Sequence, residues 1–336
     1  MTQVTTQSET APAKIHGADS LGLSVLDRIA KRAVVSRLDQ LTQGRICLQD
    51  ASSTSTHGTL PESAQHNPSV HALRVHNPVM YRQSVLGGGL GFAESYLEGD
   101  WDCDNLTELL RVFVRDIQLT HANDRKLGWL IAPSRRFGEF INRNTRSGSK
   151  RNIAAHYDLG NDFFELFLDE TMTYSSGLFE HPDSTMKDAS IAKLDRICKK
   201  LNLQPSDHVL ETGTGWGSFA IHSATHYGCK VTTTTISQQQ HDLAKQRIQS
   251  AGLSDRVTLL LEDYRTLQGQ YDKIVSIEMI EAVGHRYLDT YLGACSNLLK
   301  DDGQMMLQVI SMPSKRYRSY LRTTDFIRKH VFPGSC

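Results

Sequence analysis

The chain has 336 residues, 39% of them hydrophobic and 22% charged, a composition typical of a folded globular protein long enough for two domains. Lys+Arg and Asp+Glu both number 37, so no overall basic charge indicates a nucleic-acid partner. The six cysteines include no Cys-x-x-Cys pair, and no stretch reaches the roughly 18–20 apolar residues that span a bilayer. We therefore expect a cytoplasmic protein without a metal site.

The N-terminal residues predict a polar tail followed by a helix. Residues 1–19 are rich in Thr, Ser, Gln and Ala and are expected to be disordered. Residues 23–41 have helical periodicity, with apolar residues on one face and basic residues on the others, and Gly44 is expected to end the helix. Such a helix either lies on anionic lipid or belongs to a domain with its basic face in solvent. Its predicted apolar face contains Leu26, Ile29, Ala30, Ala33, Val34, Leu38 and Leu41.

A small α+β domain is predicted over residues 20–120. Asp104 or Asn105 is expected to cap a helix that follows it, because both side chains can accept hydrogen bonds from the first free N–H groups of a helix. A glycine-rich run precedes this segment. Strand-like pieces lie before that run, at residues 45–49, 71–77 and 79–86.

A basic linker is predicted over residues 121–150. It carries seven Lys/Arg between Arg125 and Lys150, together with Trp129, Phe137 and Phe140. This segment is either a solvated connection or a basic, partly aromatic surface that meets a membrane.

From residue 186 onward, short apolar runs alternate with helical segments of about 10–15 residues, which is typical of a parallel sheet covered by helices on both faces. Ligands of such sheets bind at the carboxyl ends of the strands. The predicted helices are 186–203, 218–228, 237–252 and 287–300, and the predicted strands are 208–213, 229–236, 256–263, 272–280 and 304–311.

A glycine turn follows the first of these strands and indicates a nucleotide-like cofactor. Glycines at 213, 215 and 217 would let backbone N–H groups approach a ligand closely. The spacing is G-x-G-x-G, whereas the dinucleotide fingerprint is G-x-G-x-x-G. Glu211 also places a carboxylate where a pyrophosphate would be repelled. Both details favour S-adenosylmethionine over NAD.

The ends of the next two strands offer further polar groups. The second strand ends in threonines followed by Gln240, without the acid that often binds ribose hydroxyls. At the third strand end, Asp263 could bond an adenine amino group and Tyr264 could cover the adenine ring; the alternative is a surface turn.

Several separated motifs resemble cyclopropane-fatty-acyl-phospholipid synthases, and mycolic acid cyclopropane synthases and related lipid C-methyltransferases share the pattern. The resemblance is specific over residues 150–336 and looser over 70–117, where LGGGLGFAESYLEGDWD looks like the lipid-binding type of N-terminal domain of the phospholipid-acting members. The motifs lie at residues 156–179, 211–220, 234–240, 263–267, 276–291 and 316–336.

The resemblance implies a seven-stranded Rossmann-like class I methyltransferase fold over residues 151–336, C-terminally incomplete relative to the family, beside the smaller α+β domain. It implies transfer of a methyl group from S-adenosylmethionine to the cis double bond of an unsaturated phospholipid acyl chain. Ring closure would give a cyclopropane, and another outcome would give a methyl branch. It further implies peripheral association with the membrane surface from the cytoplasm, and it leaves a homodimer open.

The resemblance also assigns site residues by position. The cofactor pocket would be lined by Tyr174, Ser175, Gly213, Gly215, Trp216, Thr235, Ile236, Gln240, Asp263 and Tyr264. The family holds a bicarbonate ion that acts as the base, and its cradle would correspond to Ser176, Glu281, Gln308 and Ile310. Here Ser176 replaces a cysteine and Gln308 replaces a histidine, so bicarbonate-assisted ring closure is in doubt while methyl transfer is not.

Physical chemistry gives Glu281 a separate reason for a site role. It is expected at the end of an apolar strand, where an unpaired buried carboxylate would be costly. Aromatic residues between Tyr157 and Phe179 would either offer π faces to a cationic intermediate or form core. Two other functions remain open: a small-molecule N- or O-methyltransferase on the same fold, and a non-catalytic relative that binds S-adenosylmethionine or lipid.

Overall fold

The computed structural model describes residues 24–60, 70–116, 160–321 and 323–335. The chain divides into two compact units, Met1–Ile131 and Ala132–Cys336. The expected tail and the expected basic linker, with Trp129, Phe137 and Phe140, lie outside the described residues. In the described parts, no helix is both long and apolar enough to cross a membrane.

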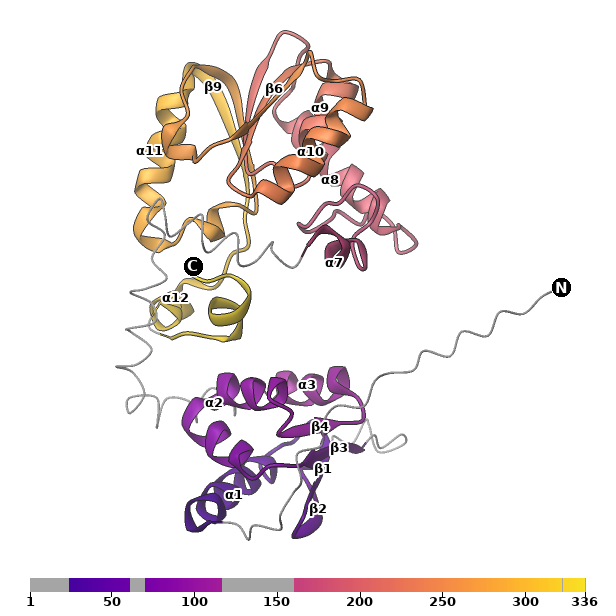
Figure 1. Ribbon diagram of the computed structural model, residues 1–336, viewed down its shortest axis with the longest axis vertical. Helices are drawn as coiled ribbons and strands as arrows, with labels where there is room; N and C mark the ends of the chain where they lie inside the picture. The colour runs from indigo at the N-terminus through magenta and orange to yellow at the C-terminus, as the bar shows by residue number, and fades with distance from the viewer. Residues whose placement is uncertain (1–23, 61–69, 117–159, 322, 336) are drawn as a thin grey trace, which may run out of the picture. The chain divides into compact units, whose positions relative to one another are not determined.

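In its described residues, the first unit is a four-stranded sheet of order β2-β1-β3-β4 with three helices (Figure 1). β1 pairs antiparallel with β2 and parallel with β3, and β3 pairs antiparallel with β4. Alternate residues of β1 and β3, such as Ile46 and Leu73, are buried against the helices in one core. The elements are α1 (Val25–Leu38), β1 (Arg45–Asp50), β2 (Ser53–His57), β3 (Val70–Val75), α2 (Val79–Leu97), β4 (Trp101–Cys103) and α3 (Leu106–Arg115).

Helix α1 belongs to this domain and packs on its core. Ala30, Val34 and Leu38 are buried as expected, but Leu26 and Ile29 are 63% and 59% exposed. The predicted apolar face was therefore too wide. The helix also ends at Leu38, before Gly44, because the chain must turn there to enter β1.

Helix α2 corrects the strand predicted at residues 79–86. The segment is helical and continues through the glycine run, with one non-helical residue, Gly88, at φ 59° and ψ −142°. Gly91 is required in this kinked helix because a Cβ there would lie 2.1 Å from the carbonyl oxygen of Gln83. The cap of the following helix is confirmed: the Asn105 side chain accepts a hydrogen bond from the Glu108 N–H at 3.1 Å.

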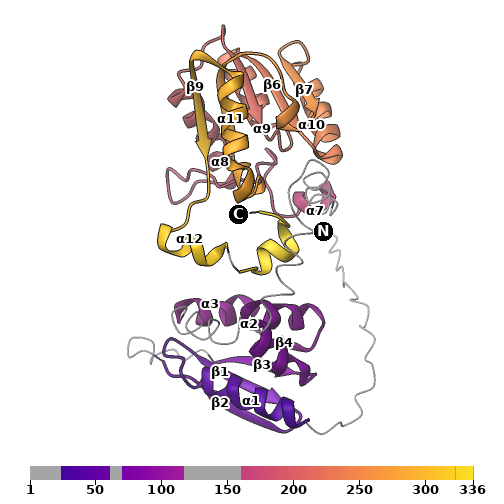
Figure 2. The same cartoon turned by 90° about the vertical axis from the view of Figure 1, so that its left-hand side faces the viewer.

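The second unit contains a five-stranded sheet of order β7-β6-β5-β8-β9 in which all pairs are parallel (Figures 1 and 2). The α/β Rossmann-like fold is confirmed, and the predicted alternation of strands and helices is observed. The elements are α7 (Asn161–Glu165), α8 (Met186–Lys200), β5 (His208–Thr212), α9 (Ser218–Tyr227), β6 (Lys230–Thr235), α10 (Gln238–Ser250), β7 (Val257–Leu261), η3 (Tyr264–Thr266), β8 (Tyr271–Ile277), η4 (Ile280–Ala282), η5 (His285–Tyr287), α11 (Leu288–Leu298), β9 (Leu299–Gln308), α12 (Ser314–Tyr320) and η6 (Ile327–Val331).

Helices cover both faces of this sheet, as is usual for parallel sheets. Val209 and Val275 pack with residues of α8, α9 and α10 in one core, whereas the neighbouring Leu210 and Ile274 pack with residues of α11 in another. Successive side chains of a strand thus serve opposite faces. Seven strands were expected, but the described residues form five, because the chain after β9 folds into α12 and η6.

His222 makes the stability of this unit depend on pH. It lies on α9, is 9% exposed, and its ring centroid is 4.6 Å from that of His226. Burial, reinforced by His226 and opposed by Asp195, lowers the pKa of His222 to about 4 from 6.5. The unfolded chain therefore binds the proton more tightly, and stability is lost as the pH falls from 6.5 towards 4, by up to about 3 kcal/mol.

We expect denaturant titrations at pH 7.5 and pH 5 to show this loss for the wild type, and His222→Gln to reduce it. The same change at the exposed His181 is the control and should leave the pH dependence as it is. An equally steep loss in His222→Gln would assign the effect to other groups.

Candidate functional site

A cavity of about 570 Å³ opens at the carboxyl ends of the strands in the second unit. Its lining comes from the turns after β5, β6, β7 and β8, from residues 172–175, and from the segment after β9. Of the residues predicted to form the site, those that line this cavity are Tyr174, Ser175, Gly213, Gly215, Trp216, Thr235, Ile236, Gln240, Asp263, Tyr264, Glu281 and Ile310. Ser176 and Gln308 lie beside it, bonded to a lining residue described below.

The glycine turn has the geometry that its sequence predicts. Gly213, Gly215 and Gly217 have φ values of 95°, 53° and 89°, in the region that favours glycine. The N–H groups of Gly213 and Thr214 bond to the carbonyl of Thr234 at 3.0 and 2.9 Å, which holds the turn against β6. A Cβ on Gly215 would meet no protein atom within 4 Å. The turn therefore presents bare backbone to the cavity.

A buried acid and a buried base lie beneath this turn. Glu211, at the end of β5, is 2% exposed and accepts a 2.6 Å hydrogen bond from Thr233. Burial raises the pKa of Glu211 to about 8, against the opposing effects of Thr233 and Lys193. Lys193 on α8 is 5% exposed, and burial lowers its pKa to about 8. Its ammonium group donates to the Ser175 hydroxyl at 2.5 Å.

The sequence did not single out Lys193 as a site residue, because it is one of several basic residues on an amphipathic helix. Only the packing of α8 shows that it is buried and lines the cavity. Since both Glu211 and Lys193 line the cavity, a ligand that carries charge would shift their protonation on binding.

The residues that follow β6 and β7 form the other side of the cavity. Thr235 donates to the amide oxygen of Gln240 at 2.8 Å, and both side chains are buried. The Asp263 carboxylate accepts from the backbone N–H of Arg265 at 3.0 Å and from its guanidinium at 2.7 and 2.6 Å. Tyr264 is 9% exposed and packs edge-on against Tyr291, with ring centroids 5.0 Å apart. Asp263 and Tyr264 are thus fixed in place, and their contact with adenine stays a prediction.

The aromatic residues of the 157–179 segment divide between core and surface. Phe164 is buried against Trp216, with ring centroids 4.9 Å apart, and Trp216 donates to the Asn161 side chain at 2.8 Å. Phe163 and Phe167 are 42% and 48% exposed. Among the described phenylalanines of this segment none lines the cavity, whereas Tyr174 does.

The four residues that the resemblance assigns to a base site lie near the carboxyl ends of the paired strands β8 and β9. Glu281 accepts the backbone N–H of Ile310 at 2.6 Å. The side-chain amide of Gln308 donates a hydrogen bond to the Ser176 hydroxyl at 3.1 Å. Glu281 lies on η4, four residues beyond the end of β8, and not at the strand end as expected. The chain must first leave the sheet through residues 278–279.

Glu278 is the residue at that strand end, and sequence reasoning did not single it out. Its carboxylate accepts from the N–H and hydroxyl of Ser176 at 3.0 and 2.8 Å and from the Gln308 amide at 2.8 Å. It lines the cavity and has a φ of 47°, which is uncommon for a residue with a side chain. The available signal was an acid directly after an apolar strand, at the edge where ligands of parallel sheets bind.

A parallel Rossmann-like sheet, a glycine turn after its first strand and a cavity at the carboxyl ends together define an S-adenosylmethionine-dependent methyltransferase. Residues 144–336 match the family model described as mycolic acid cyclopropane synthetase. The chain belongs to this family.

Individual relatives agree with this assignment. The chain is 36% identical to tuberculostearic acid methyltransferase UfaA1 of Mycobacterium tuberculosis, over 91% of this chain and 71% of the relative. It is 38% identical to the cyclopropane-fatty-acyl-phospholipid synthase of Escherichia coli, over 79% of this chain and 66% of the relative. The crystal structure of mycolic acid cyclopropane synthase CmaA1 with SAH and CTAB is similar at a TM-score of 0.52 and 34% identity, covering 55% of this chain and 68% of that one.

Proposed function

We propose that this protein transfers the methyl group of S-adenosylmethionine to a cis double bond in an unsaturated phospholipid acyl chain, giving a cyclopropane or a methyl-branched product. The observation that carries the proposal is a single cavity that joins the glycine turn to apolar side chains, among them Ile310, Met312, Ile327 and Phe332. The names of the relatives, a cyclopropane-fatty-acyl-phospholipid synthase and a tuberculostearic acid methyltransferase, support the same acceptor class.

The residues of the cavity suit such a reaction. When bound, the cofactor supplies an electrophilic methyl group. An alkene is a weak nucleophile, so it must be held in line with that methyl group and away from water. The glycine turn and Gln240 would seat the cofactor, and the apolar residues after β9 would hold the acyl chain and exclude water. Glu281, bonded to the Ile310 N–H, fixes one wall and adds negative charge near the developing cation.

The experiment that tests this function combines the full chain with methyl-labelled S-adenosylmethionine and vesicles of unsaturated phospholipid. Mass spectrometry of the released fatty acids should show a gain of one labelled carbon at the double bond. Labelled fatty acid without a ring would indicate the branch-forming outcome. Label on soluble amines or hydroxyl compounds without vesicles would favour a small-molecule methyltransferase. Cofactor binding without any labelled product would indicate a non-catalytic relative.

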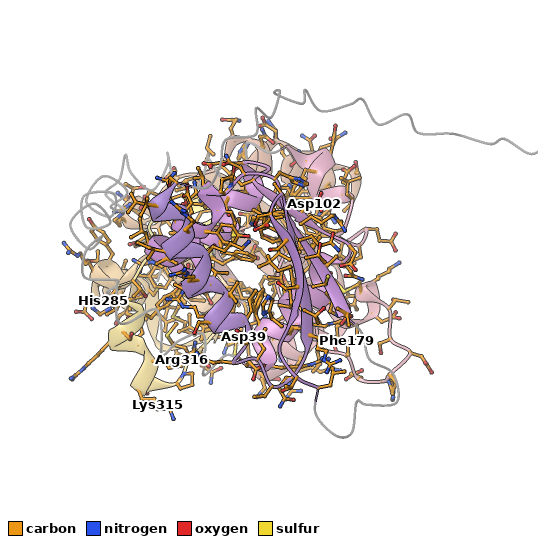
Figure 3. The ribbon with its side chains drawn as sticks, turned by 90° about the horizontal axis from the view of Figure 1, so that it is seen from below. Asp39, Asp102, Phe179, His285, Lys315 and Arg316 are labelled. Carbon is orange, nitrogen blue, oxygen red and sulfur yellow. The ribbon has the colours of Figure 1, made fainter. Side chains whose placement is uncertain are left out.

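We further propose that the protein meets its substrate at the cytoplasmic membrane surface. Apolar and basic side chains occur together beside the cavity: Ile310 is 71% exposed, and Lys315 and Arg316 extend from α12 (Figure 3). Such a pairing suits anionic headgroups above acyl chains.

We expect binding to anionic vesicles that weakens with added salt, and weaker binding after Lys315→Ala with Arg318→Ala, which removes two exposed basic side chains of α12. The control pair is Lys200→Ala with Lys230→Ala: Lys200 is the last residue of α8, Lys230 is the first residue of β6, and both are exposed and do not line the cavity. Sedimentation with vesicles of defined composition measures both. Equal binding to neutral and anionic vesicles would count against the proposal. A homodimer stays a prediction.

A further inference from the structure

Glu278 occupies an unusual position for a carboxylate. It directly follows β8, and its backbone N–H bonds to the carbonyl of Gln308 at 2.8 Å, so it is held between the carboxyl ends of two paired strands. Its φ of 47° costs free energy for any residue other than glycine, on the order of 1 kcal/mol or more. Backbone conformations of this kind concentrate at functional sites, where the surroundings hold them in place.

The donors around Glu278 are those that the resemblance assigns to bicarbonate. The Ser176 N–H, the Ser176 hydroxyl and the Gln308 amide all donate to Glu278 Oε1, at 3.0, 2.8 and 2.8 Å. The remaining donor of that set, the Ile310 N–H, donates to Glu281. A separate anion would have to displace carboxylates of the chain itself. The residues present therefore do not fit bicarbonate.

The proposed reaction still needs a proton acceptor, and the cavity offers few. Glu211 is buried, is bonded to Thr233, and has a raised pKa. Glu281 is engaged with the Ile310 backbone. Glu262 and Asp263 follow β7 at the far edge of the sheet, and Asp263 is bonded to Arg265. For Glu278, all three donors bond to Oε1, which leaves Oε2 without a donor among the described residues.

We propose that Glu278 is the catalytic base, a carboxylate of the chain itself that takes the place of an external anion; this inference rests on the proposed function. After methyl transfer, one carbon of the former double bond bears the new methyl group and the other carbon carries the positive charge. Glu278 takes a proton from that methyl group, and the electron pair of the broken C–H bond forms the carbon–carbon bond that closes the ring. The neutral carboxyl group then returns the proton to water. Because loss of this proton neutralises a carbocation, a carboxylate is a strong enough base to accept it.

Two substitutions distinguish the charge of the Glu278 side chain from the volume that it occupies. Gln at 278 can still accept from Ser176 and Gln308, so Glu278→Gln removes only the charge. Turnover should fall by at least about 100-fold, the usual contribution of a general base, with unchanged affinity for S-adenosylmethionine.

Glu278→Gly frees the three donors and relieves the backbone strain. This variant should be inactive in carbon-dioxide-depleted buffer and regain turnover in proportion to added bicarbonate. Glu180→Gln, an exposed carboxylate that does not line the cavity, is the control and should behave as the wild type.

The wild type supplies the deciding comparison. Its turnover in depleted buffer should not change when bicarbonate is added, and carbon-13 NMR of labelled bicarbonate should show binding to Glu278→Gly but not to the wild type. Turnover of the wild type that requires bicarbonate, or near wild-type turnover of Glu278→Gln, would overturn the inference and leave the proposed function standing. Absence of labelled lipid from the wild type would instead overturn the proposed function, and the base role with it. If Glu278→Gln proves unfolded by its thermal melt, the bicarbonate response of Glu278→Gly decides.

Discussion

Replacing Gly215 with valine is expected to remove measurable binding of S-adenosylmethionine from a protein that remains folded. Gly215 lies in the turn after β5 at a φ of 53°, and a Cβ added there would meet no protein atom within 4 Å. The open space is the cavity itself, because Gly215 is part of its lining. A valine side chain would therefore occupy the volume that the cofactor needs. We expect the affinity to fall by more than about 100-fold, which is about 3 kcal/mol, in calorimetric titrations.

Gly252 provides a matched control for this substitution. It lies between α10 and β7, has a φ of 68°, and likewise has nothing within 4 Å of an added Cβ, but it does not line the cavity. Valine at either position carries the same kind of backbone penalty, about 1–2 kcal/mol or more for a β-branched residue. The two variants should therefore melt at similarly lowered temperatures, and only Gly215→Val should lose the cofactor. Equal affinity in both variants would show that the turn does not contact the cofactor.

Replacing Glu281 with glutamine is expected to lower turnover by about 100-fold or more while cofactor affinity is kept, since groups aimed at charge that develops in the transition state contribute on this scale. Glu281 Oε1 accepts the Ile310 N–H at 2.6 Å, and the amide oxygen of glutamine can accept the same bond. The wall of the cavity should thus stay in place. What is lost is a negative charge in the lining, beside a reaction in which the acyl chain becomes cationic.

Glu262→Gln tests whether any charge of the cavity would have the same effect. Glu262 also lines the cavity, but it follows the edge strand β7, on the opposite side of β5 from β8. At saturating S-adenosylmethionine its turnover should remain near that of the wild type, and any change should appear in the KM for the cofactor. Steady-state kinetics with both substrates varied separate these results. A similar loss of kcat in both variants would mean that Glu281 acts only through the total charge of the cavity.

Elements that depend on local chemistry were predictable from the sequence. Helix α8 begins at a capping box in which Thr185 and Asp188 satisfy each other's backbone N–H groups, and Asn105 caps α3 in the expected way. The glycine spacing of 213–217 located the turn that presents bare backbone to the cavity. The prediction of a strand at residues 79–86 was wrong because the apolar residues of this segment suit either a strand or a helix. Their burial in α2 is decided by packing against β1 and β3.

The sequence by itself determined the class of fold, the position of the cofactor turn and the family, because periodicity, capping and glycine spacing act over a few residues. Only the tertiary structure decided which polar groups meet. Glu278 joins Ser176, 102 residues away, and Gln308, 30 residues away, because the parallel pairing of β8 and β9 brings their carboxyl ends to one edge. Lys193 and Glu211 share the interior for the same reason: the packing of α8 against the sheet, which no local pattern encodes, removes both from water.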